Sequence, residues 1–410
     1  MSTAADLATT AARSVPVDLP GGLLDRLPEP AGALAWVRDG EGLVAWGEAA
    51  RLEVSGPDRF TRARDWWRAL VGSWSVEDEV RVPGSGPVAF GSFTFDDGPG
   101  RSVLVVPQVV LGRRAGQSWL TTVGDVLRPS APRPVHRPSG LRYAAGEMSV
   151  TAFRHAVAEA VTRIRRGDLA KVVLAHDLVA TADADLDPRF LLSRLTARYP
   201  GCWTYAVDGL VGATPELLVS RQGDEVLSRV LAGTTARGAD ADDDRARTAA
   251  LMGSTKDREE HRYAVESLVD SLAPHCADLS VPATPYVLEL SNVAHLATDV
   301  TGTLTDGACS LDLAGALHPT AAVGGTPTDA AVRALRELEG MDRGRYAGPV
   351  GWVDAGGDGE WGLALRCAQV DGGTARLFAG CGIVADSDPD AEVLEAQAKF
   401  VAVRDALEGV

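Results

Sequence analysis

The 410-residue sequence contains almost no lysine. Among its 40 basic residues, only Lys171, Lys256 and Lys399 are lysine, and all the others are arginine. Arginine keeps its proton under ordinary conditions, whereas a lysine amine loses its proton when burial or a nearby cation favours the neutral form. Each lysine is therefore a candidate for chemistry that arginine cannot perform, and chance placement is the alternative.

Several common targeting and redox features are also missing. No apolar run approaches the roughly 18 residues that span a bilayer, and the N-terminus lacks the charged start and apolar stretch of a secretory signal. The five cysteines are scattered, odd in number and without a CxxC pair, which is typical of reduced thiols rather than disulfides or zinc sites. We therefore expect a cytoplasmic protein with no membrane span, in which residues 1–13 form a disordered tail.

Features of nucleotide and nucleic-acid binding are absent as well. No GxGxxG follows an apparent strand, and no GK[ST] occurs, so the sequence carries no phosphate-binding fingerprint. The formal net charge is −16, which disfavours contact with nucleic acid or with an anionic membrane. We expect neither as a partner.

The order of the remaining patterns predicts an α+β fold. Residues 14–125 read as short strands around a helix at 59–74, and a proline-rich connection spans 127–147. Residues 348–384 read as three long strands joined by two Gly/Asp turns, which predicts an antiparallel meander. A capped helix at 389–407 follows. We expect long antiparallel strands with helices packed over them.

Two predicted helices carry acids at spacings that bring side chains together. Glu392, Glu395 and Lys399 lie at i, i+3 and i+7 in the last helix, so they share one face. Asp257 and Glu260 form an i, i+3 pair in the first turns of another helix. Acids from two helices are able to hold a hard cation such as Mg²⁺. A solvated acidic surface is the alternative.

Ionisable residues also interrupt apolar strings. Lys171 lies within "LAKVVLAHDL", Glu216 follows a turn in "VGATPELL", and Arg366 lies within "WGLALRCAQ", which reads as the middle of a strand. A buried amine is a potential general base, and a buried carboxyl a potential general acid. A buried guanidinium requires a carboxylate from the protein or from a ligand. The alternatives are an edge-strand lysine, an ordinary turn glutamate, and core roles for Tyr346 and His295.

These strings resemble, in order, the motifs of the chorismate-utilising enzymes. The resemblance covers about residues 146–405 and rests on the following strings: "KVVLAH", "VGATPELL", "LAGTTARG", "KDREEH", "VAHLATDV", "LHPTAAVGGTP", "YAGPVGW", "LALRCAQ" and "AGCGIVADSDPDAEVLEAQAK". It implies large antiparallel β-sheets packed around a deep cleft, with helices outside. Residues 14–145 would then be the N-terminal β-rich part of the fold, and 146–410 the chorismate-binding catalytic domain.

Three positions within the resemblance favour one branch of the family. Lys171 lies where members that use water carry a general base, whereas members that use ammonia typically have Gln. Ala232 replaces the nucleophilic Lys of aminodeoxychorismate synthases, and Ala322 replaces the Thr usual in members that expel pyruvate. The implied activity is reversible conversion of chorismate to isochorismate by a monomer without a glutaminase subunit. Salicylate synthesis, or a silent chorismate-binding relative, are the alternatives.

The resemblance also implies roles for individual residues. Lys171 and Glu216 match the catalytic base and acid, and Glu260, Glu395 and Glu392 match the Mg²⁺ carboxylates. A further set matches positions that contact or enclose substrate: Arg366, Lys399, Tyr346, His295, Gly233, Thr234, Ala322, Gly380 and Gly382. The resemblance leaves open whether the product serves menaquinone, catechol siderophore or salicylate synthesis.

Overall fold

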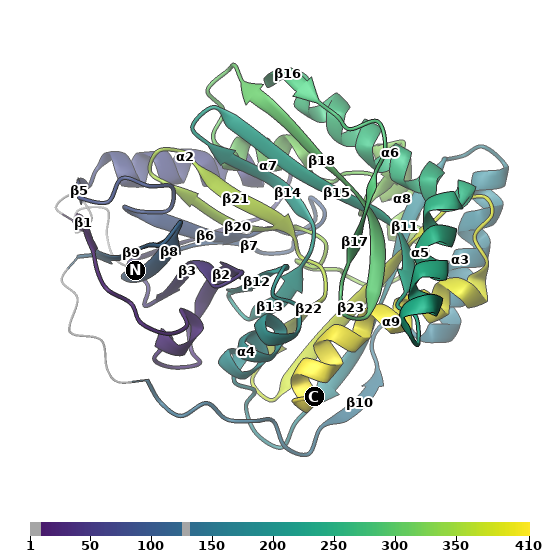
Figure 1. Cartoon of the computed structure of the whole chain (residues 1–410), viewed down its shortest axis with the longest axis horizontal. Helices are drawn as coiled ribbons and strands as arrows, with labels where there is room; N and C mark the ends of the chain where they lie inside the picture. The colour runs from purple at the N-terminus through teal and green to yellow at the C-terminus, as the bar shows by residue number, and fades with distance from the viewer. Residues whose placement is uncertain (1–9, 125–131) are drawn as a thin grey trace.

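The computed structural model describes residues 10–124 and 132–410, which form two large β-sheets with α-helices on their outer faces (Figure 1). Almost all strand neighbours pair antiparallel, and β1 with β5 is the parallel exception among the described strands. The α+β prediction is therefore confirmed. Within the described ranges, no helix is long and apolar enough to cross a membrane.

The first sheet has 13 strands. Strand β19 (Gly325–Thr326) pairs with β11 beside the main path. The order along the path is β10 (Arg142–Ala145), β11 (Lys171–Thr181), β23 (Thr374–Ile383), β22 (Cys367–Asp371), β13 (Leu210–Thr214), β12 (Trp203–Val207), β2 (Leu34–Arg38), β3 (Glu41–Trp46), β8 (Val109–Arg114), β9 (Gln117–Val123), β1 (Ala11–Pro16) and β5 (Ser75–Asp78).

The second sheet has 10 strands. Strand β17 (Tyr286–Glu289) pairs with β18 beside the main path. The order along the path is β16 (Cys276–Ser280), β18 (Val293–Leu304), β15 (Glu225–Ala236), β14 (Leu217–Gln222), β21 (Gly359–Leu363), β20 (Pro349–Asp354), β6 (Val88–Ser92), β7 (Ser102–Val106) and β4 (Ala50–Val54).

Each sheet has its own layer of helices. The 10-stranded sheet contacts α2 (Arg59–Gly72), α5 (Ala241–Gly253), α6 (Thr255–Leu272) and α7 (Ser310–Leu317). The 13-stranded sheet contacts α3 (Val150–Arg165), α4 (Pro188–Arg198), α8 (Thr328–Leu338) and α9 (Pro389–Glu408). A short 3-10 helix, η1 (Leu24–Arg26), lies near α4. Helix α9 begins as the sequence predicts, because the Asp388 side chain accepts from two backbone N–H groups and Pro389 fits the first turn.

The N-terminal strands extend both sheets. Strand β2 pairs with β12, and β6 pairs with β20, so residues before 146 complete sheets that the later residues begin. The expected tail of residues 1–13 extends too far, because strand β1 already begins at Ala11. Ala12 is buried and pairs with Val123, and this pairing fixes the strand from Ala11 onward. Residues 1–9 of the expected tail lie outside the described residues.

The prediction of a three-strand meander at 348–384 is wrong, and the difference changes the position of Arg366. The segment forms four strands, of which β20 and β21 belong to one sheet and β22 and β23 to the other. The chain crosses between the sheets at residues 364–366, where Arg366 adopts a φ of 48°. Arg366 therefore lies at a crossing between two strands rather than in the middle of one.

Candidate active site

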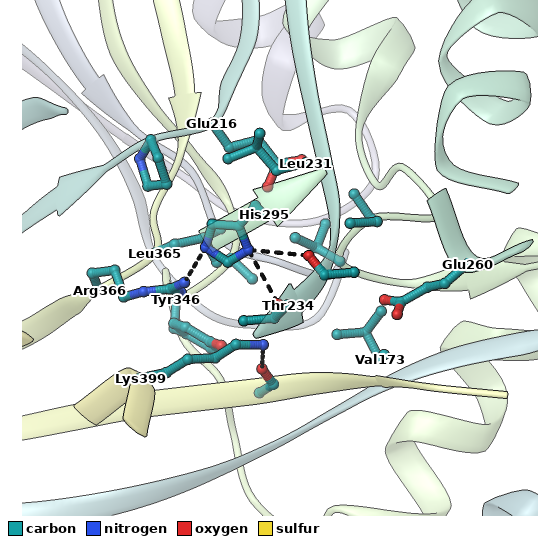
Figure 2. Close-up of a pocket in the computed structure, with 18 of the residues that line it drawn as sticks. Val173, Glu216, Leu231, Thr234, Glu260, His295, Tyr346, Leu365, Arg366 and Lys399 are labelled. Carbon is teal, nitrogen blue, oxygen red and sulfur yellow. Dashed lines mark hydrogen bonds between the residues drawn. The ribbon is translucent and has the colours of Figure 1, made fainter. Parts of the chain in front are cut away.

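A cavity lies where the two sheets meet, and most of the predicted site residues line it (Figure 2). Its walls come from β15 and β18 of one sheet, β23 of the other, the turn after β13, the 364–366 crossing and helix α9. The predicted residues that line it are Glu216, Gly233, Thr234, Glu260, His295, Ala322, Tyr346, Arg366, Gly380, Gly382 and Lys399. Three predicted residues are not among those that line it: Lys171, Glu392 and Glu395.

Glu216 occupies the tight turn between β13 and β14. Its backbone N–H donates to Thr214 Oγ1 at 3.2 Å, which fixes the turn, and only 4% of the residue is exposed. Burial raises the pKa of Glu216 to about 8, although a backbone hydrogen bond from Leu231 and the ammonium of Lys171 act in the opposite direction. The carboxyl is thus mostly protonated near pH 7, as a general acid must be.

His295 and Arg366 form a hydrogen-bonded pair on one side of the cavity (Figure 2). Arg366 Nη2 lies 3.0 Å from His295 Nε2, and a guanidinium is only a donor, so Nε2 is the acceptor. The proton is then on Nδ1, which lies 3.1 Å from Thr234 Oγ1 and 3.4 Å from the Gly233 carbonyl oxygen. Burial, followed by the charge of Arg366, holds the pKa of His295 well below its usual value. A neutral imidazole therefore orients the guanidinium toward the cavity.

Gly233 lies in a strand. It sits within β15 at a φ of 77°, where the register against β18 shifts between Ala232 and Thr234. This is the geometry of a β-bulge, and a positive φ favours glycine. The bulge presents the Gly233 carbonyl and the Thr234 hydroxyl to the same ring nitrogen of His295.

Lys399 and Tyr346 close the cavity near β23. Lys399 Nζ donates to the Gly380 carbonyl oxygen at 2.8 Å and to Glu395 Oε1 at 2.6 Å. The Tyr346 ring stacks on Phe378, with centroids 5.0 Å apart and planes at 9°. Burial raises the pKa of Tyr346 to about 12, so its hydroxyl stays a neutral donor. Together they place one ammonium and one phenol beside the glycines of β23.

Lys171 is fully buried on β11 and contacts Glu260, which lines the cavity. Its Nζ lies 3.3 Å from Glu260 Oε1 and has no hydrogen-bond partner among the described residues. A Cβ added at Gly382 would lie 1.9 Å from Glu260 Oε1 and 3.2 Å from Lys171 Cε. The missing side chain at Gly382 therefore creates the space that the Lys171–Glu260 pair occupies.

All three lysines of the chain contact the three predicted metal carboxylates, one each. Lys171 pairs with Glu260, Lys399 Nζ lies 2.6 Å from Glu395 Oε1, and Lys256 Nζ lies 2.7 Å from Glu392 Oε1. Sequence reasoning gave no role to Lys256. The only signal in the sequence was that lysine is rare. That signal does not identify the partner of Lys256, which lies 136 residues away along the chain.

Two of the three predicted metal carboxylates lie close together. Ligand atoms of Cys381, Glu392 and Glu395 all lie within 4.8 Å of one another, and the buried Glu392 Oε2 has no hydrogen-bond partner in the described part of the chain. Glu260 is not in this group and pairs with Lys171. Burial alone would lower the pKa of Lys256, but Glu392, Glu395 and Glu260 together raise it. The hard oxygen donors of these carboxylates fit Mg²⁺-like ions.

The two helix glutamates differ in protonation. Burial, and then the charge of Glu395, raises the pKa of Glu392 to about 7. Burial also opposes ionisation of Glu395, but the Lys399 ammonium more than offsets it and lowers the pKa of Glu395 below its usual value. Near pH 7, Glu395 is therefore ionised and Glu392 is partly ionised.

Arg343 also lines the cavity, and the sequence analysis did not select it. Its Nε donates to Glu339 Oε2 at 2.8 Å and its Nη1 to the Val323 carbonyl oxygen at 3.0 Å. Both partners of this pair are buried. The pair fixes the residue that follows Ala322. An i, i+4 Glu–Arg spacing was the signal in the sequence, but it also fits a common surface pair.

Comparison with known proteins identifies the family. The family model for chorismate binding enzymes matches residues 34–128 and 125–408, so the chain belongs to this family of enzymes. MenF of Mycobacterium tuberculosis, assigned as an isochorismate synthase, is 41% identical over 347 residues, covering 79% of this chain and 87% of that protein. The salicylate biosynthesis isochorismate synthase of Pseudomonas aeruginosa is 34% identical over 412 residues, covering 92% and 85%.

A solved structure agrees with the sequence relatives. DhbC of Bacillus anthracis, assigned as a 2,3-dihydroxybenzoate-specific isochorismate synthase, superimposes with a TM-score of 0.79 at 30% identity. The match covers 94% of this chain and 98% of that one. The predicted family and fold are confirmed. Enzymes of this family generally depend on a divalent metal.

Proposed function

We propose that this protein is an Mg²⁺-dependent isochorismate synthase that converts chorismate reversibly to isochorismate. The observation that carries the proposal is a buried carboxyl, Glu216, with a pKa of about 8, on the same cavity as Glu260, whose ion-pair partner is Lys171. Exchange of one hydroxyl for another requires an acid that stays protonated at pH 7 and a base, and the Lys171 amine is our candidate for the base. The names of the relatives support the same activity.

The proton transfers follow from this arrangement. The Lys171 amine, uncharged when it acts, accepts a proton from water as that water attacks ring carbon 2. Glu216 gives its proton to the 4-hydroxyl, which leaves as water. One hydroxyl replaces another, so the reaction is close to balanced and runs in both directions.

Substrate binding needs local positive charge, because chorismate is a dianion and the chain has a net charge of −16. Arg366 and Lys399 line the cavity and hold substrate carboxylates. Glu260 and Glu395, with Glu392 nearby, hold Mg²⁺. When bound, the ion supplies positive charge that stabilises the substrate carboxylate. Gly233, Thr234, His295 and Tyr346 orient and enclose the ring.

The test is a product assay with purified full-length protein, chorismate and Mg²⁺. Isochorismate should accumulate without pyruvate, and chelation should stop turnover. Prompt pyruvate release would indicate a salicylate synthase instead, and absence of any conversion would refute the proposal. Ala322→Thr should introduce some pyruvate release, while undiminished turnover by Lys171→Ala would eliminate that residue as the base.

The finer statements on assembly and location are also proposals. We propose that the enzyme acts as a cytoplasmic monomer and needs no glutaminase subunit, since it uses water rather than ammonia. Light scattering on the active protein should give a mass near 42.9 kDa. A stable dimer, or turnover that requires ammonium, would contradict this part of the proposal.

A further inference from the structure

A thiol lies beside the carboxylates of the proposed Mg²⁺ site. Cys381 is fully buried on β23, and its Sγ lies within 4.8 Å of ligand atoms of both Glu392 and Glu395. The second oxygen of Glu392 is buried and unpartnered among the described residues, because Lys256 contacts only Oε1. Mg²⁺ prefers oxygen ligands and rarely binds sulfur. The reaction proposed above does not use this thiol.

We propose that Cys381, Glu392 and Glu395 form a second metal-binding mode, selective for thiophilic divalent ions of the Zn²⁺ class. Zn²⁺ binds thiolate sulfur at about 2.3 Å and carboxylate oxygen at about 2.1 Å, which places tetrahedral ligands roughly 3.5 Å apart. The three ligand atoms lie within 4.8 Å of one another, so each pair needs to close by about 1.3 Å at most. A water completes the tetrahedron.

Metal binding at Cys381 replaces the thiol proton. The Sγ–metal bond forms, the proton leaves to water, and no group is oxidised. Three anionic ligands and one divalent ion leave one negative charge, which the ammonium groups of Lys256 and Lys399 offset.

The two metal modes exclude each other because both require Glu395. On the proposed function, Zn²⁺ bound through Cys381 removes this carboxylate from the Mg²⁺ site and inhibits turnover. The binding itself does not depend on that function. It rests on the positions of the sulfur and the two carboxylates, and it is measurable without substrate.

Co²⁺ replaces Zn²⁺ as the spectroscopic probe on the intact protein. We expect a near-ultraviolet thiolate-to-cobalt charge-transfer band, which Zn²⁺ abolishes by displacement. Cys381→Ala should lose the band and weaken Zn²⁺ binding by at least about 100-fold. The matched control is Cys276→Ala, another buried cysteine, on β16, and it should keep both. Thermal unfolding of the two variants checks that each is folded.

The outcomes separate this inference from the proposed function. No charge-transfer band, or a band that persists in Cys381→Ala, would overturn the inference. A band in a protein that makes no isochorismate would leave the inference in place and refute the proposed function. If turnover is present, Zn²⁺ should inhibit it in the native protein and in Cys276→Ala, but not in Cys381→Ala. Equal inhibition in all three would contradict the sharing of Glu395.

Discussion

Replacement of Glu216 by glutamine isolates the effect of one buried carboxyl on stability. Glutamine has nearly the same shape but does not ionise. Burial raises the pKa of Glu216 from 4.5 to about 8, so ionisation is harder in the folded protein than in the unfolded chain. At about 1.4 kcal/mol for each tenfold change, the difference is about 5 kcal/mol.

The sign of the pH dependence follows from the raised pKa. The stabilising effect of the protonated carboxyl is fully present below pH 4.5, where both states of the protein bind the proton. It declines as the pH rises from 4.5 and is lost above about 8, where both states release it. The free energy of unfolding of the native protein, relative to that of Glu216→Gln, should therefore fall by about 4 kcal/mol between pH 4.5 and 8, and by about 5 kcal/mol over the whole titration.

Denaturant unfolding of both proteins at a series of pH values from 4.5 to 9 measures this difference. All other titrating groups are shared, so subtraction removes their contribution. The same variant should lose roughly 10²–10⁴ of its turnover, because the amide cannot supply the proton. A difference in stability that stays constant across the series would refute the claim that this carboxyl is buried and protonated, whatever the activity shows.

Two further predictions concern the carboxylates Glu260 and Glu392. Lys256→Met leaves the buried Glu392 without its counter-charge, so it should destabilise the metal-free protein by roughly 3 kcal/mol, and Mg²⁺ should restore part of this stability. Thermal unfolding with chelator and with Mg²⁺ measures both effects, and an unchanged unfolding transition in chelator would contradict the prediction. Gly382→Ala places a Cβ on Glu260 and should reduce turnover by about 100-fold, whereas Gly72→Ala, which meets no atom within 4 Å, should retain it.

The secondary structure was largely predictable, but the assignment of strands to sheets was not. Alternating apolar patterns and Gly/Asp turns identify strands, because side-chain direction has a period of two. They do not specify which distant strand lies alongside. Residues 348–384 therefore read as one meander, whereas β21 and β22 belong to different sheets. The crossing depends on the φ of 48° at Arg366, and a lone arginine in an apolar string gives no sign of that conformation.

Individual contacts in the site were also only partly predictable from the sequence. Glu216 and Lys171 were identifiable because charged residues within apolar strings imply burial, and the structure buries both. The partner of Lys256 was not identifiable. Its spacing from Glu260 fits an ordinary i, i+4 pair on a helix surface, yet it contacts Glu392 on another helix, and Glu260 contacts Lys171 instead. Which carboxylate each lysine contacts therefore depends on how helices α6 and α9 pack, and the residues near Lys256 in the sequence do not specify that packing.

The scarcity of lysine has a physical explanation in this cluster. An arginine beside a carboxylate commonly engages both oxygens through its planar fork, whereas an ammonium is a point charge that needs only one. Lys256 contacts Oε1 of Glu392 and leaves Oε2 without a partner among the described residues. A lysine thus neutralises a buried acid and still leaves an oxygen for a metal. In a chain that otherwise uses arginine, this difference explains a lysine beside Glu392, one of the proposed metal carboxylates.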